Sequence, residues 1–257
     1  MSPLASMNWS DEGIVLSVRP HGETAAVLEL LTRAHGRHLG LVHGGRGRRL
    51  RPVLQIGNHV DATWKGRLSE QLGYYAIELR KGYAASALER PLALAGLTSL
   101  CALARLLPER DPHPDLYEIT LFVLSYLDDD SIWPALYVRW ELNLLAELGF
   151  GLDLSCCAAT GATDGLAWVS PKSGRAVSAA AGEPYRDRLL PLPRFLVSSQ
   201  GTRVTLHDVL KGLTLTGTFL TKRVLDPRDM TMPEARQRLF AALSRSTDEK
   251  VLQFSRP

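Results

Sequence analysis

The fold of this chain is decided near its start, where residues 13–42 read GIVLSVRPHGETAAVLELLTRAHGRHLGLV. Three short apolar runs lie in this stretch with turn-forming residues between them, and two similar runs follow. The five predicted strands are residues 13–18, 25–31, 38–42, 53–64 and 72–83. Five short strands without a helical segment between them predict a small closed barrel, because closure leaves no strand edge exposed. The oligonucleotide-binding (OB) barrel is the commonest five-stranded solution, although an SH3-like barrel fits the same strand count.

Positive charge is concentrated in the same part of the sequence. Residues 31–60 contain no Asp or Glu. From Arg33 to Arg67 there are eight Arg or Lys residues against one acid, Asp61, so the local charge is near +7 in a chain whose net charge is +3. The eight candidate nucleic-acid-binding residues are Arg33, Arg37, Arg46, Arg48, Arg49, Arg51, Lys65 and Arg67. This cluster favours a polyanionic partner over a merely solvated arginine-rich hairpin, and in an OB barrel it would link the third and fourth strands.

From about residue 84 onward, apolar residues recur at three- and four-residue steps, which is typical of amphipathic helices. The predicted helices are residues 92–107, 115–127, 133–148, 206–224 and 233–243. Gly149 stands where a left-handed C-terminal cap belongs, and Thr205 with Asp208 offers a capping box. The basic residues predicted on the polar side of the last helix are Arg236, Arg238 and Arg245.

Residues 153–193 differ in kind from the helical segments around them. Two turn-forming knuckles, at 157–161 and 170–174, have the spacing of a four-ligand zinc ribbon. Cys157 is the one cysteine in the first knuckle, and serines occupy the ligand places of the second. We therefore expect a zinc-ribbon-like insertion that lacks the metal ligands, with no metal and no cofactor.

The predicted fold class is α+β, with an N-terminal five-stranded OB-fold barrel followed by an α-helical domain that carries the degenerate ribbon-like loop. The predicted parts are a disordered extension at 1–7, an OB-fold nucleic-acid-binding domain at 8–83, a helical domain at 84–152 and 194–257, and the insertion at 153–193. Three cysteines, two of them adjacent, make a poor disulfide framework and indicate a reducing compartment. Because no apolar run approaches the ~20 residues that span a bilayer, we expect a cytoplasmic protein without membrane contact.

The sequence favours a binding protein over an enzyme. It contains no phosphate-binding loop with Gly-Lys-Ser/Thr, no Gly-x-Ser-x-Gly elbow and no His-Glu-x-x-His helix. The acidic residues 128–130 could hold a divalent metal as in nucleases, but a solvated helix end explains them more simply. We therefore expect no catalytic residues.

Several short strings, in order along nearly the whole chain, resemble those of the RecO-type recombination mediators of bacterial DNA repair. The matching strings are DEGIVL (11–16), GET (22–24), TRAHGR (32–37), HGGRGR (43–48), ELNLLAELGF (141–150), CAATG (157–161) and VSPKSGR (169–175). No single string is diagnostic, but their order and spacing together are specific. Some members of that family carry a four-cysteine zinc site, from which this chain departs.

The resemblance implies binding of single- and double-stranded DNA, annealing of complementary strands, and help in loading RecA onto DNA coated with single-strand-binding protein in the RecF pathway. The implied partners are the C-terminal tail of single-strand-binding protein and RecR, and the implied location is the nucleoid. Arg105, Arg139 and Arg223 lie on helical segments and are candidates for binding that acidic, apolar-ended tail. An OB-fold module that binds RNA is the alternative, because phosphate chemistry is shared.

Overall fold

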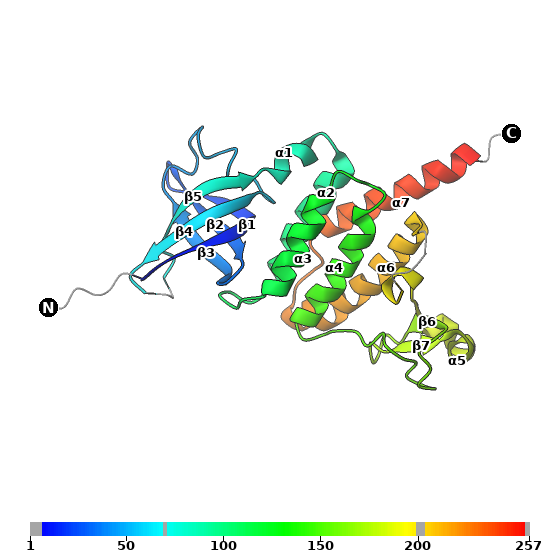
Figure 1. Ribbon diagram of the computed structural model, residues 1–257. Coiled ribbons are helices and arrows are strands. Elements are labelled where there is room, and N and C mark those ends of the chain that lie inside the picture. Colours follow the sequence, from blue (N-terminus) through cyan, green and yellow to red (C-terminus); the bar gives the residue numbers. More distant parts are fainter. Residues whose placement is uncertain (1–6, 69–70, 199–203, 255–257) are drawn as a thin grey trace. The chain divides into compact units, whose positions relative to one another are not determined.

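The computed structural model of this chain describes residues 7–68, 71–198 and 204–254 and divides into two compact units, which meet in sequence between Asp128 and Asp129 (Figure 1). The extension predicted at 1–7 lies outside the described residues, except for Met7. That residue begins the first strand and pairs with Gly66.

The first unit begins with a closed five-stranded barrel of order β1-β2-β3-β5-β4, which confirms the predicted fold (Figure 1). Its strands are β1 (Met7–His21), β2 (Ala25–Thr32), β3 (Gly36–Val42), β4 (His59–Gly66) and β5 (Tyr74–Lys81). The first strand is long because its N-terminal half pairs with β4 and its C-terminal half pairs with β2. The ladders are antiparallel except between β3 and β5, where Leu41 pairs with Tyr74 in parallel.

The fourth strand begins later than the sequence predicts. The apolar run from residue 53 does not extend, because Leu54 enters the barrel core from a helical turn, with its N–H bonded to the Leu50 carbonyl at 2.9 Å. Gly57 then adopts a left-handed φ of +86°. The Asn58 side chain donates to two carbonyls of this turn at 2.9 and 3.1 Å. These local bonds satisfy the backbone that a strand would have paired elsewhere.

The barrel core is built from the inward-facing residues of all five strands. Trp64 is its largest member, and 1% of its surface is exposed. Its indole N–H donates to the Leu72 carbonyl at 3.1 Å. Gly66 and Gly73 lie against the ring so closely that a Cβ on either would come within 2.4 Å of it. Trp64 is therefore a core residue of the barrel.

Three helices complete the first unit: α1 (Tyr83–Leu88), α2 (Pro91–Ala104) and α3 (Pro114–Ser125). Both α2 and α3 open with a proline. Proline suits the first helical turn because a backbone N–H at that position would have no acceptor within the helix. The second half of β2 is buried on both faces, since the barrel fills one side and this helical part of the unit covers the other.

The second unit is mainly helical. Its main helices are α4 (Trp133–Glu147), α6 (Leu206–Phe219), the π-helical turn η3 (Leu220–Leu225) and α7 (Glu234–Phe254). Its small elements are β6 (Leu166–Val169), β7 (Ala176–Ser178), α5 (Ala179–Gly182), η1 (Glu183–Arg188), β8 (Leu190–Pro191), η2 (Arg194–Leu196) and η4 (Asp226–Arg228). The predicted capping box of Thr205 and Asp208 opens α6. Gly149 follows α4 with the expected left-handed φ of +84°.

The last helix differs from its prediction in length and in one side chain. It continues to Phe254 rather than ending at residue 243. Arg236, predicted on the polar side, is 5% exposed and forms a two-bonded ion pair with the fully buried Glu141 of α4, at 2.9 and 3.1 Å. The prediction was wrong because the partner carboxylate lies almost a hundred residues away in sequence.

Candidate nucleic-acid interface

The basic segment that follows β3, residues 44–51, is folded against the turn between β1 and β2. The backbone N–H of Arg46 donates to the Thr24 carbonyl at 3.0 Å. Its guanidinium donates to the carbonyls of Gly22 and Glu23, each at 2.9 Å. Residues 47–51 then form a helical turn that is closed by an N–H to carbonyl bond of 3.0 Å. The segment is thus an ordered connection between the third and fourth strands, as the sequence predicts.

Most of the predicted binding residues expose their side chains. The exposed ones are Arg33, Arg46, Arg48, Arg49, Arg51, Lys65 and Arg67. Within the ranges that the structure describes, none of the last five is paired with a carboxylate. Their charges are therefore open to an anion from solution.

Arg37 is placed differently. Its side chain is 16% exposed and forms an ion pair with the buried Glu29, and its Nε donates to the Leu107 carbonyl at 2.8 Å. It also lies 3.5 Å from the Glu109 carboxylate. The structure thus engages Arg37 inside the first unit, where it joins β3 to the residues after α2.

Arg33 is exposed but paired: it forms an ion pair with Glu118 on α3 at 2.9 Å, and both side chains remain about half exposed. A surface pair of this kind contributes little to stability and separates easily. Arg33 therefore remains accessible to an anion that competes with the Glu118 carboxylate, in contrast to Arg37.

Glu29 holds the network around Arg37. Burial opposes ionisation of this carboxyl, but hydrogen bonds from Ser17 at 2.7 Å and from Arg37, with the charge of Arg105 at 2.8 Å, bring its pKa below the ordinary value. The sequence did contain a signal for this role. Glu29 is the single acid in the apolar run 25–31, and a buried acid requires a cation.

Sequence reasoning missed an aromatic pair beside the basic segment. Tyr74 begins β5, and the ring of His43, just after β3, stacks on it with centroids 4.7 Å apart and planes inclined by 15°. Tyr74 is 51% exposed. The two residues are 31 positions apart in sequence, so no local pattern brought them together. The alternation of Tyr74 with the buried Tyr75 nevertheless indicated that Tyr74 faces outward.

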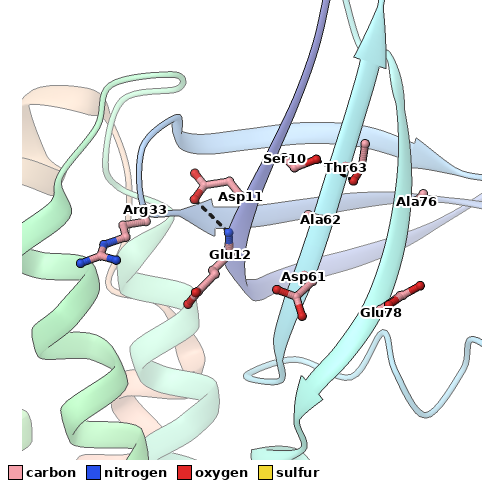
Figure 2. A pocket seen from close by; sticks show the side chains of 9 residues that line it. All are labelled: Ser10, Asp11, Glu12, Arg33, Asp61, Ala62, Thr63, Ala76 and Glu78. Carbon is pink, nitrogen blue, oxygen red and sulfur yellow. Dashed lines mark hydrogen bonds between the residues drawn. The ribbon is translucent and has the colours of Figure 1, made fainter.

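The other end of the same outer barrel face is acidic. A groove of about 510 Å³ opens there over β1, β4 and β5 (Figure 2). Its lining residues are Ser10, Asp11, Glu12, Arg33, Asp61, Ala62, Thr63, Ala76 and Glu78. Four carboxylates line the groove against one arginine, and Arg80, which binds two of them from beside the groove, does not offset all four, so the groove disfavours a phosphate.

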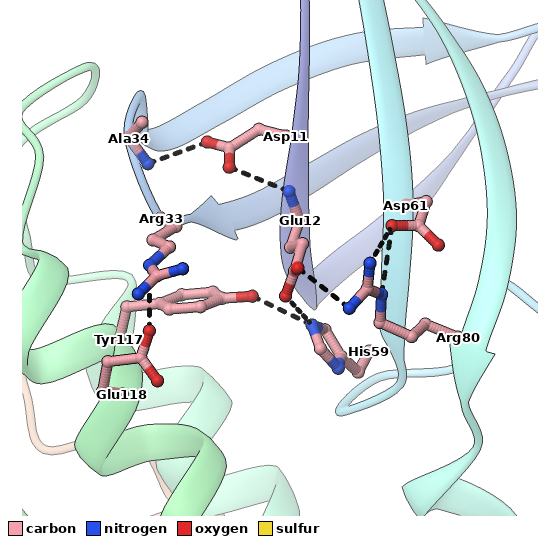
Figure 3. Close-up of polar contacts among 9 residues, drawn as sticks. All are labelled: Asp11, Glu12, Arg33, Ala34, His59, Asp61, Arg80, Tyr117 and Glu118. Atoms are coloured by element: carbon pink, nitrogen blue, oxygen red, sulfur yellow. Dashed lines mark hydrogen bonds and ion pairs between the residues drawn. The ribbon is translucent and has the colours of Figure 1, made fainter.

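Polar bonds fix most of these carboxylates in place (Figure 3). Arg80 binds Glu12 at 2.9 Å and Asp61 at 3.0 Å. Glu12 also contacts Nε2 of His59 at 3.2 Å, and the same nitrogen lies 3.0 Å from the Tyr117 hydroxyl of α3. Burial lowers the pKa of His59, although the Glu12 carboxylate partly opposes this. These bonds tie the barrel wall to the helix that packs on it.

Residues 153–193 of the second unit form both predicted turns. Cys157 and Gly161 close the first with a 2.8 Å backbone bond, and Ser170 and Gly174 close the second with another of 2.8 Å. Contacts with Ser178 lower the pKa of the Cys157 thiol to about 6: the sulfur lies 3.5 Å from the Ser178 hydroxyl oxygen and accepts the Ser178 backbone N–H at 3.2 Å. Among the described residues, no three His, Cys, Asp or Glu side chains gather as metal ligands.

No helix in the described part of the chain is both long and apolar enough to cross a bilayer.

Comparison with known families matches residues 7–83 to the model described as Recombination protein O N terminal, and residues 88–230 to Recombination protein O C terminal.

Curated proteins similar to this chain carry the name DNA repair protein RecO. The protein of Methylobacterium nodulans is 59% identical over 241 residues, which cover 92% of this chain and 98% of the relative. The protein of Methylorubrum extorquens is 58% identical, with coverage of 91% and 98%. That of Rhodospirillum centenum is 56% identical, with coverage of 90% and 93%.

Proposed function

The chain belongs to the RecO family and has a role in DNA repair, and from this premise we propose that it binds single- and double-stranded DNA and anneals complementary strands. The observation that carries the proposal is the ordered basic segment, whose exposed arginines have no carboxylate partner within the described residues. Each phosphate bound there releases condensed counterions, which favours binding regardless of base sequence.

Annealing follows from the same surface. Two complementary strands repel each other, and a concentrated positive surface screens that repulsion while the bases find their partners. The chemistry needs neither nucleotide hydrolysis nor a cut strand, so the proposed activity has no catalytic residue.

The proposed partners are RecA, which is loaded onto coated single strands, RecR, and the tail of single-strand-binding protein. A groove of about 520 Å³ in the second unit supports the proposed binding of the tail, because Met232 and Phe240 supply apolar surface and Lys222 supplies positive charge. The arginines that the sequence offered for this tail, Arg105, Arg139 and Arg223, each bind a group within their own unit. We expect Lys222→Ala to weaken binding of an acidic, apolar-ended peptide, and Lys172→Ala to leave it unchanged.

The deciding experiment removes Arg48, Arg49 and Arg51 together, each to Ala. Arg46 is kept because its guanidinium holds the turn between β1 and β2. The matched control removes three exposed arginines of the second unit, namely Arg186, Arg188 and Arg194. Both variants lose the same charge.

The slope of log affinity against log salt for single-stranded DNA should fall by about 2 in the first variant, since each phosphate contact contributes ~0.7, and should hardly change in the control. An unchanged slope in the first variant would refute the proposal. Competition between DNA and RNA strands of one sequence, measured at two salt concentrations, tests the RNA alternative. Tighter binding of RNA than of DNA at both salt concentrations would favour that alternative. Annealing of coated strands should proceed without added nucleotide.

A further inference from the structure

We propose that a base of single-stranded DNA stacks on the ring pair of Tyr74 and His43, and that this contact makes the barrel prefer single strands. The inference rests on the proposed DNA binding and adds a site for the bases to the site for the phosphates. An unpaired base carries an exposed ring face, whereas a base within a duplex already has both faces covered by its neighbours.

The pair has the geometry of a stacking platform. Its rings are nearly parallel, with centroids 4.7 Å apart, and they lie on the outer wall of the barrel. Both residues are exposed, and half of the Tyr74 surface is open to solvent. A third ring can therefore extend the stack without displacing a core residue, unlike the buried Trp64.

Cations lie where the phosphates of a stacked base require them. Lys65 is the direct cross-strand partner of Tyr74, and both side chains point outward because their neighbours Trp64 and Tyr75 point inward. Arg67 follows two residues later and is also exposed. On the other side, His43 leads directly into the basic segment that begins at Gly44. A strand crossing the platform thus meets positive charge on both sides.

Hydrogen bonds to neighbouring strands hold the backbone that carries Tyr74. Gly73 has a left-handed φ of +57° and lies against the Trp64 ring. Its carbonyl accepts the Leu41 N–H at 3.0 Å, which joins β5 to β3 directly beside Tyr74. Because the backbone on both sides of the ring is fixed by bonds to the barrel, little order has to be created on binding.

The acidic groove directs the strand toward this end of the barrel. Asp61 pairs with Glu78 across β4 and β5, and Asp61 precedes Lys65 by four residues, or roughly 13 Å along the strand. Asp61 and Glu78 both line the acidic groove (Figure 2). Phosphates near these carboxylates are disfavoured, whereas phosphates near Lys65, opposite Tyr74, are attracted. The favourable path therefore crosses the strand ends that carry Tyr74.

The test compares Tyr74→Ala with Tyr74→Phe, with His43→Ala and with the control Tyr185→Ala, an exposed tyrosine of the second unit. Each variant is titrated with a single-stranded oligonucleotide, with the same oligonucleotide carrying abasic sites, and with a duplex. Circular dichroism and thermal melting confirm that each variant is folded. Because base stacking on an aromatic ring contributes a non-ionic part of the affinity, its loss should leave the salt dependence intact.

Tyr74→Ala should weaken single-strand binding by roughly 5- to 100-fold with an unchanged salt slope, and His43→Ala should weaken it less. Tyr74→Phe and Tyr185→Ala should bind like the wild type, and duplex binding should be unaffected by all four. The wild type should lose a similar factor on abasic DNA, where Tyr74→Ala should lose nothing further.

Three results would overturn the stacking site: wild-type single-strand affinity in Tyr74→Ala, an equal loss for duplex, or Tyr74→Phe binding no better than Tyr74→Ala. These results are distinct from failure of DNA binding itself. If Arg48, Arg49 and Arg51 control the salt slope while Tyr74→Ala is neutral, the phosphate site stands and only the stacking site is refuted. If the wild type binds no DNA, both proposals fail.

Discussion

Replacing Arg236 by Met would leave the buried carboxylate of Glu141 without its cation. Glu141 has no exposed surface, and Arg236 gives it two hydrogen bonds while also donating to the Leu213 carbonyl at 2.5 Å. The Thr216 hydroxyl also binds Glu141, but a neutral donor does not replace a positive charge.

The expected loss is large because the remaining carboxylate cannot reach water. Removing one partner of a buried pair costs about 3–5 kcal/mol of unfolding free energy. For a unit of this size, each kcal/mol lowers the melting temperature by about 3–4 °C, so we expect a decrease of roughly 10–20 °C. Arg238→Met is the matched control, because Arg238 is exposed and its pair with Glu234 at 3.0 Å contributes only about 0.3–0.5 kcal/mol.

Urea denaturation and calorimetry of the full chain measure both variants. The double variant Glu141→Leu with Arg236→Met should recover most of the loss, since it removes the stranded charge along with its partner. The reasoning would be refuted if Arg236→Met lost less than about 1 kcal/mol, or if the double variant lost the sum of its two single changes.

Three further outcomes are expected. The pKa of Glu29 is lowered in the folded chain, so its ionised form stabilises the fold at pH above the ordinary carboxyl range, and this stabilisation is lost as pH falls through the folded-state pKa. Urea denaturation at descending pH should show a steeper loss of unfolding free energy in the wild type than in Glu29→Gln. Equal slopes would contradict this. Gly73→Ala should lower the free energy of unfolding by about 1–3 kcal/mol, measured by thermal melts, because residue 73 has a left-handed φ and an added Cβ would meet the Trp64 ring. An unchanged melting temperature would show that the turn relaxes freely. Cys157→Ala should remain folded and anneal DNA normally, and elemental analysis should find less than one zinc per chain, whereas one tightly bound zinc would revive a metal site.

Much of the fold was predictable because local patterns specify it. The alternation around Tyr74 and Tyr75 and the turns before β3 indicate strands, and Gly149 marks the end of α4. The position of the basic segment between the third and fourth strands followed from the strand count alone. Where a residue's environment comes from its neighbours in sequence, these rules work well.

The features that the sequence did not reveal depend on distant partners. Arg37 resembles the other arginines of the basic segment in sequence, but Glu29 and the Leu107 carbonyl engage it. Arg236 lies on a helix with Arg238, yet Glu141 draws it into the core. No sequence pattern distinguishes such an arginine from an exposed one, because the difference lies in an acid that only the folded chain brings near.

The separation of charge along β4 has a kinetic consequence. An acidic groove at one end and cations at the other give the barrel wall an electric dipole. In the field of a polyanion such a dipole feels a torque, so the barrel should turn its basic end toward DNA before any contact forms. Added salt should then slow association itself as well as loosen the bound state, because the field that orients the molecule falls off within a Debye length of ~8 Å at physiological ionic strength.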